Sequence, residues 1–159
     1  MQPELFKNKD KEHNPEMITA VHESGHLVQL LLAGKVPEFV NIIPNKIHAG
    51  SVSGGSILIA DVAQDWDQNW RYRIKCLYGG LIASAFYCGA YLYDRAHVDL
   101  ELTEEERKLY GLTEGDLLEC WISVHKDIKL HWGIIWEMSE KLFKEKLLGA
   151  EYYEELLLT

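Results

Sequence analysis

The segment from residue 15 to residue 34 constrains the fold most, because it is apolar around most of a helix and yet carries ionisable side chains at its centre. Asn14 supplies an N-cap, a proline follows at the first helical position, and the final glycine can end the helix. A helix that is apolar over most of its circumference is buried in the core of its domain. Any fold of this chain therefore has to bury His22, Glu23 and His26.

His22 and His26 are spaced i and i+4, so on a helix their side chains share one face, roughly 6 Å apart. Two imidazoles placed in this way can bind one metal ion. Glu23 follows about 100° round the helix, beside the metal, which suits a general base that acts on zinc-bound water. The pattern also occurs by chance, but an apolar helix has little reason to bury these three groups unless something pairs them. Gly25 is consistent with close packing around such a site.

The rest of the chain predicts one mainly α (α+β) domain over residues 14–159, preceded by a polar lead-in at residues 1–13. The length suits a single hydrophobic core. Residues 40–44 are typical of a strand closed by proline, and residues 51–60 of a second strand. We expect the two to pair as a small antiparallel β element beside the first helix.

Helical periodicity returns over residues 65–93, where the double glycine at 79–80 predicts either a kink or a close packing contact. Thr103 and the acidic residues after it fit a capping box, which predicts a helix start at that point. Residues 113–158 predict a long amphipathic helix or a helical hairpin, with a break near Trp132 and a last helical turn or two at the end.

Composition argues against several classes of function. The formal net charge is −9, from 16 basic and 25 acidic side chains, which disfavours binding to nucleic-acid phosphates. The 3 cysteines, without CxxC spacing, predict buried thiols at Cys76, Cys88 and Cys120. No apolar run reaches the ~18 residues of a membrane helix, and residues 1–12 lack the apolar core of a signal peptide. We therefore expect a cytoplasmic protein with neither membrane nor nucleic acid as partner.

Several segments match, in the same order, the motifs of one known peptidase family. They are the HESGH helix at 22–26, the VNIIP strand at 40–44, the SGGS strand at 53–56, the YGGLIA helix at 78–83 and the closing helical segment at 113–158. From about residue 15 to its end, the chain thus resembles the peptidase domain of FtsH-type ATP-dependent zinc metalloproteases. The resemblance implies zinc as cofactor, His22 and His26 as ligands, and Glu23 as the catalytic base.

The resemblance also implies how a substrate binds. The edge of the strand at 51–60 would pair with the extended main chain of a peptide, through Gly54, Gly55 and Ser56. Two departures from the family matter. No GxxxxGK[ST] loop occurs in this sequence, so we expect the chain not to unfold proteins by ATP hydrolysis on its own. Ser84 and Ala85 stand where the family has acidic residues after the double glycine, which removes a carboxylate near the site.

A catalytic zinc needs a third protein ligand, which the family supplies as an aspartate downstream of the double glycine. Asp99 and Asp116 both lie in Asp-Leu pairs that could match this aspartate. We favour Asp99 because its separation from the double glycine is close to the family's spacing, whereas Asp116 fits a charge in the first turn of a helix. His97 and Asp94 are further alternatives. A helix start at Thr103 would leave Asp99 before a helix, although the family's ligand lies within one.

The sequence therefore predicts a zinc peptidase that hydrolyses unfolded or short polypeptides, with zinc held by His22, His26 and Asp99 and with Glu23 as general base. The main alternative is a peptidase-derived metal-binding or partner-binding module without proteolytic activity. A metal-dependent hydrolase that acts on other substrates is a third hypothesis. The peptide substrate is the expected partner, and a homo-oligomer or a separate ATPase partner are further alternatives suggested by the family.

Overall fold

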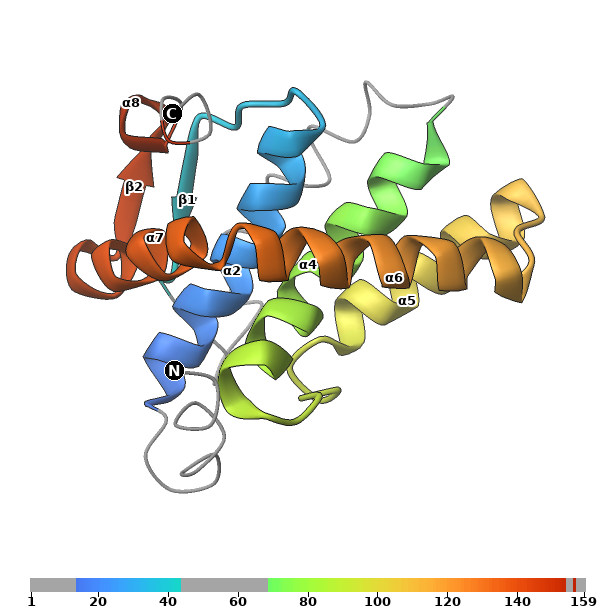
Figure 1. The fold of residues 1–159 in the computed structure, drawn as a ribbon, viewed down its shortest axis with the longest axis horizontal. Coiled ribbons are helices and arrows are strands. Elements are labelled where there is room, and N and C mark those ends of the chain that lie inside the picture. The colour runs from blue at the N-terminus through green and yellow to red at the C-terminus, as the bar shows by residue number, and fades with distance from the viewer. Residues whose placement is uncertain (1–13, 44–68, 154–155, 157–159) are drawn as a thin grey trace.

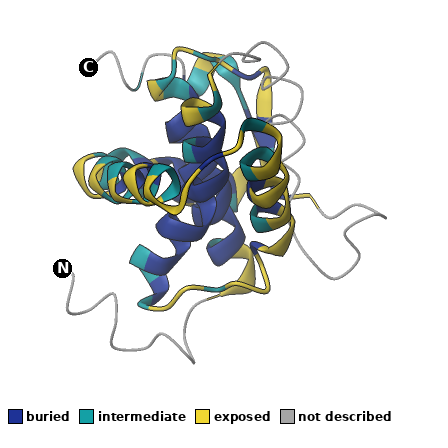
Figure 2. Ribbon diagram, turned by 90° about the vertical axis from the view of Figure 1, so that its right-hand side faces the viewer, coloured by how far each residue is buried: buried dark blue, intermediate teal, exposed yellow. Residues whose placement is uncertain are grey.

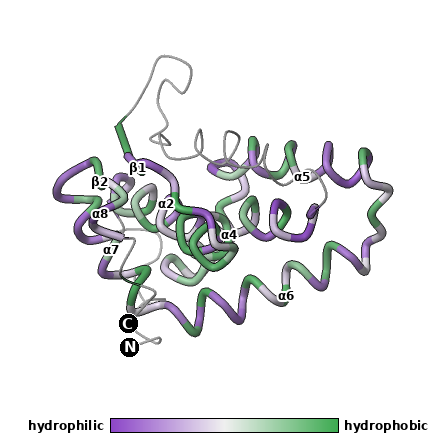
Figure 3. The backbone as a smooth tube through the Cα atoms, turned by 90° about the horizontal axis from the view of Figure 1, so that it is seen from above, coloured by the Kyte–Doolittle hydropathy of each residue, from purple (hydrophilic) through white to green (hydrophobic). Residues whose placement is uncertain are grey.

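The computed structural model of the chain describes residues 14–43, 69–153 and 156. In chain order the elements are α2 (Pro15–Leu32), β1 (Phe39–Asn41), α4 (Trp70–Cys88), α5 (His97–Tyr110), α6 (Glu114–Leu130), α7 (Trp132–Glu145), β2 (Leu147–Gly149) and α8 (Ala150–Tyr153). Helices α2 and α4 lie at the centre, and α5, α6 and α7 lie around them (Figure 1, Figure 3). The predicted fold class, mainly α with a small antiparallel β element, is confirmed.

Helix α2 begins and ends where the sequence predicts. The Oδ1 atom of Asn14 accepts a hydrogen bond from the backbone N–H of Glu16 at 2.8 Å, and the chain leaves the helix through Gly34, whose φ is 80°. Every residue from Ile18 to Leu30 is buried, which makes α2 the central element of the core (Figure 2). None of the helices in the described ranges is long and apolar enough to span a bilayer.

Helices α2 and α4 pack backbone against backbone at their crossing. A Cβ atom on Gly25 would lie 2.2 Å from the carbonyl oxygen of Gly79 and 2.5 Å from the Cβ of Ala83, distances that only glycine permits. The double glycine therefore serves packing, and α4 continues through it as one helix. The helix ends at Cys88, before the predicted end of the helical stretch, because Gly89 adopts a left-handed φ of 78°.

The predicted helix start at Thr103 is wrong. Helix α5 begins at His97, so Thr103 lies in its interior, where its hydroxyl donates a hydrogen bond of 2.8 Å to the carbonyl oxygen of Asp99. The predicted start of α6 is confirmed by a capping box. The Oγ1 atom of Thr113 accepts from the N–H of Asp116 at 3.1 Å, and the Asp116 carboxylate accepts from the N–H of Thr113 at 2.8 Å.

The break predicted near Trp132 lies at His131, between α6 and α7. The two helices do not form a hairpin: α6 packs against α4, α7 packs against α2, and the chain changes direction at the junction (Figure 3). This arrangement lets two consecutive helices cover the two central ones.

The sheet joins distant parts of the chain. Strand β1 pairs antiparallel with β2, with Val40 opposite Leu148, although the residues of β2 were expected to be helical. The buried Tyr153 supports this pair, because its hydroxyl donates a hydrogen bond to the carbonyl oxygen of Pro37. The predicted second strand, residues 51–60, lies outside the described residues. The partner found for β1 therefore comes from the C-terminal region.

Candidate metal centre

Side chains from α2 and α5 converge at one buried point. The Nε2 atoms of His22 and His26 lie 3.0 Å and 3.1 Å from Oδ2 of Asp99, and 2.9 Å from each other. All three side chains are buried. Within the described part of the chain, these residues form a group whose nitrogen and oxygen atoms lie close enough together to share one metal ion.

The spacing of these three atoms fits a zinc ion. Zinc binds histidine nitrogen and carboxylate oxygen at about 2.0–2.2 Å in a tetrahedron, which places neighbouring ligand atoms roughly 3.3–3.5 Å apart. The distances of 2.9 to 3.1 Å between the three atoms are slightly shorter, so a small outward movement of each side chain suffices. Two nitrogens and one oxygen are also the donor types that zinc accepts, with a fourth position left for water or substrate.

A backbone carbonyl of α4 orients the second histidine. The Nδ1 atom of His26 lies 2.6 Å from the carbonyl oxygen of Cys76, which can only accept a hydrogen bond. Nδ1 therefore carries the proton, and in the neutral ring Nε2 has a free lone pair directed at His22 and Asp99. This second hydrogen bond is the usual way in which proteins orient a histidine toward a metal.

In the metal-free site, burial and the opposite charges of the neighbouring groups shift the pKa values of these three side chains in opposite directions. Burial lowers the pKa of His26, but the charge and hydrogen bond of Asp99 outweigh burial and raise it to about 9. Burial lowers the pKa of His22 and prevails there. Burial raises the pKa of Asp99, but the charge of His26 and hydrogen bonds from both histidines leave it well below its usual range. Without a metal, the site therefore holds a proton on His26, where Nε2 faces the Asp99 carboxylate.

Glu23 lies next to this cluster, and its carboxylate has no hydrogen-bond partner in the described part of the chain. The residue is 1 % exposed. Burial raises the pKa of this carboxyl group to about 8. Leaving a buried polar group unsatisfied costs about 1–3 kcal/mol. The protein thus maintains an acid–base group, with a pKa near neutrality, beside three potential metal ligands.

Helix α4 leaves room for the site at Gly80. A Cβ atom at this position would lie 2.5 Å from Nε2 of both His22 and His26. Any side chain would therefore occupy the space directly in front of the two nitrogen atoms. The packing role predicted for the double glycine is divided: Gly79 allows the helices to approach each other, and Gly80 keeps the space beside the imidazoles free.

The structure brings together His22, Glu23, His26 and Asp99, the predicted site residues that it describes. Asp116 takes no part in the cluster and caps α6, while the other two alternatives, His97 and Asp94, are exposed. The residues predicted to bind substrate, Gly54, Gly55 and Ser56, lie outside the described ranges.

No protein-family model matches this chain, and no curated protein or solved structure shows a significant match. The similarity to FtsH-type peptidases therefore stays a prediction from the sequence motifs.

Two contributions to the site were not foreseen. The Cys76 carbonyl has no sequence signal, because any residue can supply a backbone oxygen. Arg95 donates from Nη1 to the Oγ1 of Thr19 at 3.0 Å, which ties the chain before α5 to α2 one turn before the HESGH motif. Burial is the main cause of the lowered pKa of His22, and the charge of Arg95 adds to the lowering. The sequence could have drawn attention to Arg95 only through its nearness to Asp99.

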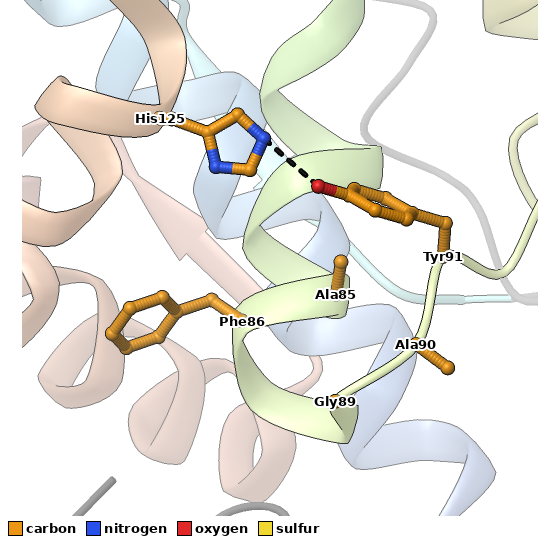
Figure 4. A pocket seen from close by; sticks show the side chains of 6 residues that line it. All are labelled: Ala85, Phe86, Gly89, Ala90, Tyr91 and His125. Carbon is orange, nitrogen blue, oxygen red and sulfur yellow. Dashed lines mark hydrogen bonds between the residues drawn. The ribbon is translucent and has the colours of Figure 1, made fainter. Parts of the chain in front are cut away.

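A separate cavity of about 250 Å³ lies where α4 ends and the following loop faces α6 (Figure 4). The Tyr91 hydroxyl oxygen lies 3.0 Å from Nε2 of His125 across this cavity. The cavity is lined by Ala85, Phe86, Gly89, Ala90, Tyr91 and His125. None of the four converging site residues lines it, so the cavity and the candidate metal centre are distinct.

Proposed function

We propose that this chain is a zinc-dependent peptidase that hydrolyses peptide bonds in unfolded or short polypeptides. His22, His26 and Asp99 would hold the zinc ion, and Glu23 would act as general base. The observation that carries the proposal is the buried carboxyl group of Glu23, which has no hydrogen-bond partner in the described residues and lies beside three converging ligand atoms.

A purely structural site would not need this carboxyl group. His22, His26 and Asp99 already contact one another, whereas Glu23 adds a polar group that has no partner among residues 14–43, 69–153 and 156. Such a cost is typical of functional sites, where a buried polar side chain has no hydrogen-bond partner until the substrate binds. A pKa near neutrality is also what general base catalysis requires.

Individual residues of the chain have separate roles in the proposed hydrolysis. Glu23 takes a proton from the attacking water as the water oxygen bonds to the carbonyl carbon of the substrate. The same carboxyl group then gives the proton to the leaving nitrogen as the C–N bond breaks. Asp99 and the Cys76 carbonyl hold the two imidazoles in place. Zinc, when bound, supplies a Lewis acid that polarises the substrate carbonyl and acidifies water.

The Glu23→Gln variant tests this proposal. The change keeps the size of the side chain but removes the proton acceptor, so zinc content and thermal stability should stay close to those of the wild type. Cleavage of denatured casein or a peptide library should fall by at least ~100-fold, the lower range for loss of general base catalysis. Glu16→Gln is a matched control, because it makes the same change at an exposed position of α2.

Metal analysis completes the test. Wild type should hold about one zinc per chain, His26→Ala should hold none, and His131→Ala should behave as wild type. Because two histidines and a carboxylate also bind iron(II), the analysis should measure both metals. A zinc-loaded wild type that cleaves no peptide would favour the binding-module alternative. Equal cleavage by wild type and Glu23→Gln would reject Glu23 as the base.

A further inference from the structure

Arg95 differs from the other arginines of the protein in having no acidic partner among the described residues. The other three lie within 4.0 Å of a glutamate, in the pairs Arg71–Glu119, Arg73–Glu106 and Arg107–Glu104. Within the described residues, Arg95 makes one side-chain hydrogen bond, to Thr19, and no ion pair. An uncompensated cation is notable in a chain with a formal net charge of −9.

The position of Arg95 is set by the two elements that carry the site. Its backbone lies just before α5, one turn ahead of Asp99, and its Nη1 atom is bound to Thr19 on α2. The Thr19 hydroxyl donates to the carbonyl oxygen of Pro15 at 3.1 Å, so its oxygen is oriented to accept from Arg95. Thr19 and Glu23 are spaced i and i+4 and share one helix face, roughly 6 Å apart. The Arg95 side chain is exposed, so its other N–H groups are accessible to a ligand.

Arg95 bonds to Thr19, about one helical turn before His22 and Glu23, so it lies beside the ligand atoms along α2. One turn of a helix rises about 5.4 Å, which is the length of one to two residues of an extended chain at roughly 3.3–3.6 Å per residue. A guanidinium group recognises a carboxylate through two parallel hydrogen bonds.

We infer that Arg95 binds a carboxylate of the substrate one or two residues from the scissile peptide bond. This inference rests on the proposed peptidase function and adds substrate selectivity to it. The carboxylate can be the C-terminal group of the peptide or an acidic side chain near the cleaved bond. The net negative charge of the protein repels an acidic substrate, so Arg95 provides a local attraction.

Binding of two small acids tests the inference without turnover. Benzylsuccinate carries two carboxylates, one for the metal and one for Arg95, whereas 3-phenylpropionate carries one. Calorimetry on zinc-loaded wild type should show at least tenfold tighter binding of benzylsuccinate. Arg95→Gln should abolish this difference, Arg95→Lys should restore part of it, and Arg107→Gln should leave it unchanged. Equal affinities in the wild type, or an undiminished difference in Arg95→Gln, would overturn the inference while leaving zinc binding intact.

Cleavage assays then identify the source of the carboxylate. Three forms of one short peptide are compared: the free C-terminal acid, the C-terminal amide, and an amide with glutamate after the scissile bond. Arg95→Gln should raise KM at least tenfold for the preferred acidic form and leave the neutral amide unchanged. Preference for the free acid would indicate the C-terminal group, and preference for the glutamate form the side chain. A uniform loss on all three forms would contradict the inference, and a wild type without zinc would overturn the peptidase proposal and the inference together.

Discussion

The Nδ1 atom of His26 on α2 lies 2.6 Å from the carbonyl oxygen of Cys76 on α4. This contact determines which nitrogen of the ring can bind a metal, because a carbonyl oxygen accepts only from a protonated nitrogen. The approach of the two helices at Gly25 and Gly79 makes the contact possible. Helix packing therefore determines which nitrogen of His26 faces Asp99.

Zinc binding should release a proton from His26. The pKa of His26 is raised to about 9 in the metal-free site, so at pH 6 its Nε2 carries a proton that zinc has to displace. We expect Glu23→Gln to release about one proton per zinc at pH 6, because the pKa of His22 is lowered and Asp99 is already ionised. Wild type should release at least as many protons per zinc, because Glu23, with a pKa of about 8, can also lose a proton when zinc binds.

Calorimetry in buffers of different ionisation enthalpy measures this proton. By the same reasoning, zinc affinity should rise about tenfold per pH unit for each proton displaced, up to the pKa of His26 near 9. Zinc binding by Glu23→Gln at pH 6 without proton release would show that His26 is neutral in the metal-free protein.

Gly80→Ala should weaken zinc binding without removing any ligand. The new methyl group would lie 2.5 Å from Nε2 of both His22 and His26, so the rings would have to move away from each other or from Asp99. We expect at least a tenfold loss of zinc affinity, measured by competition with a chromogenic chelator. Overpacking of this kind costs about 1–3 kcal/mol, partly offset by the roughly 1 kcal/mol that alanine gains over glycine in a helix.

Gly133→Ala is the control for this experiment. Gly133 lies in α7, and a Cβ atom there would meet nothing within 4 Å. The substitution should leave zinc affinity unchanged and raise the free energy of unfolding by up to about 1 kcal/mol. Unchanged zinc binding by Gly80→Ala would contradict the position that we assign to the metal.

Asp99→Ala should lose zinc, whereas Asp116→Ala should keep it. Removal of a residue that merely supports a ligand weakens metal binding about 10–100-fold, so loss of the ligand Asp99 should cost at least ~10-fold. Asp116 caps α6, and its replacement should lower thermal stability modestly. Zinc content and melting temperature should be measured for both variants. Retention of zinc by Asp99→Ala together with loss of zinc from Asp116→Ala would reject Asp99 as the third ligand.

The start of α5 could not be predicted from the local sequence. The residues after Thr103 fit a capping box, yet the helix begins at His97, and the backbone N–H of Leu100 donates to the carbonyl oxygen of Ala96 at 2.9 Å. This earlier start places Asp99 in the first turn of a helix, where its carboxylate reaches the histidines of α2. Spacing relative to the peptidase family selected Asp99, but local propensity alone would have placed it outside the helix.

The pairing in the small sheet could not be predicted from the local sequence either. Residues 40–44 were predicted to form a strand, and β1 lies at Phe39–Asn41, but its partner β2 was expected to be helical. Three residues at 147–149 have no periodicity by which a strand could be recognised. Their conformation follows from pairing with β1, a contact between the two ends of the described chain.

The sequence by itself determined the burial of α2 and the shared face of His22 and His26, because helix periodicity and capping depend on residues within a few positions of each other. Only the tertiary structure decided that Asp99, the Cys76 carbonyl and Gly80 meet these histidines. Each of these contacts joins different helices, so it depends on how the helices pack. The site is therefore prepared by one local motif and completed by the packing of α4 and α5 against it.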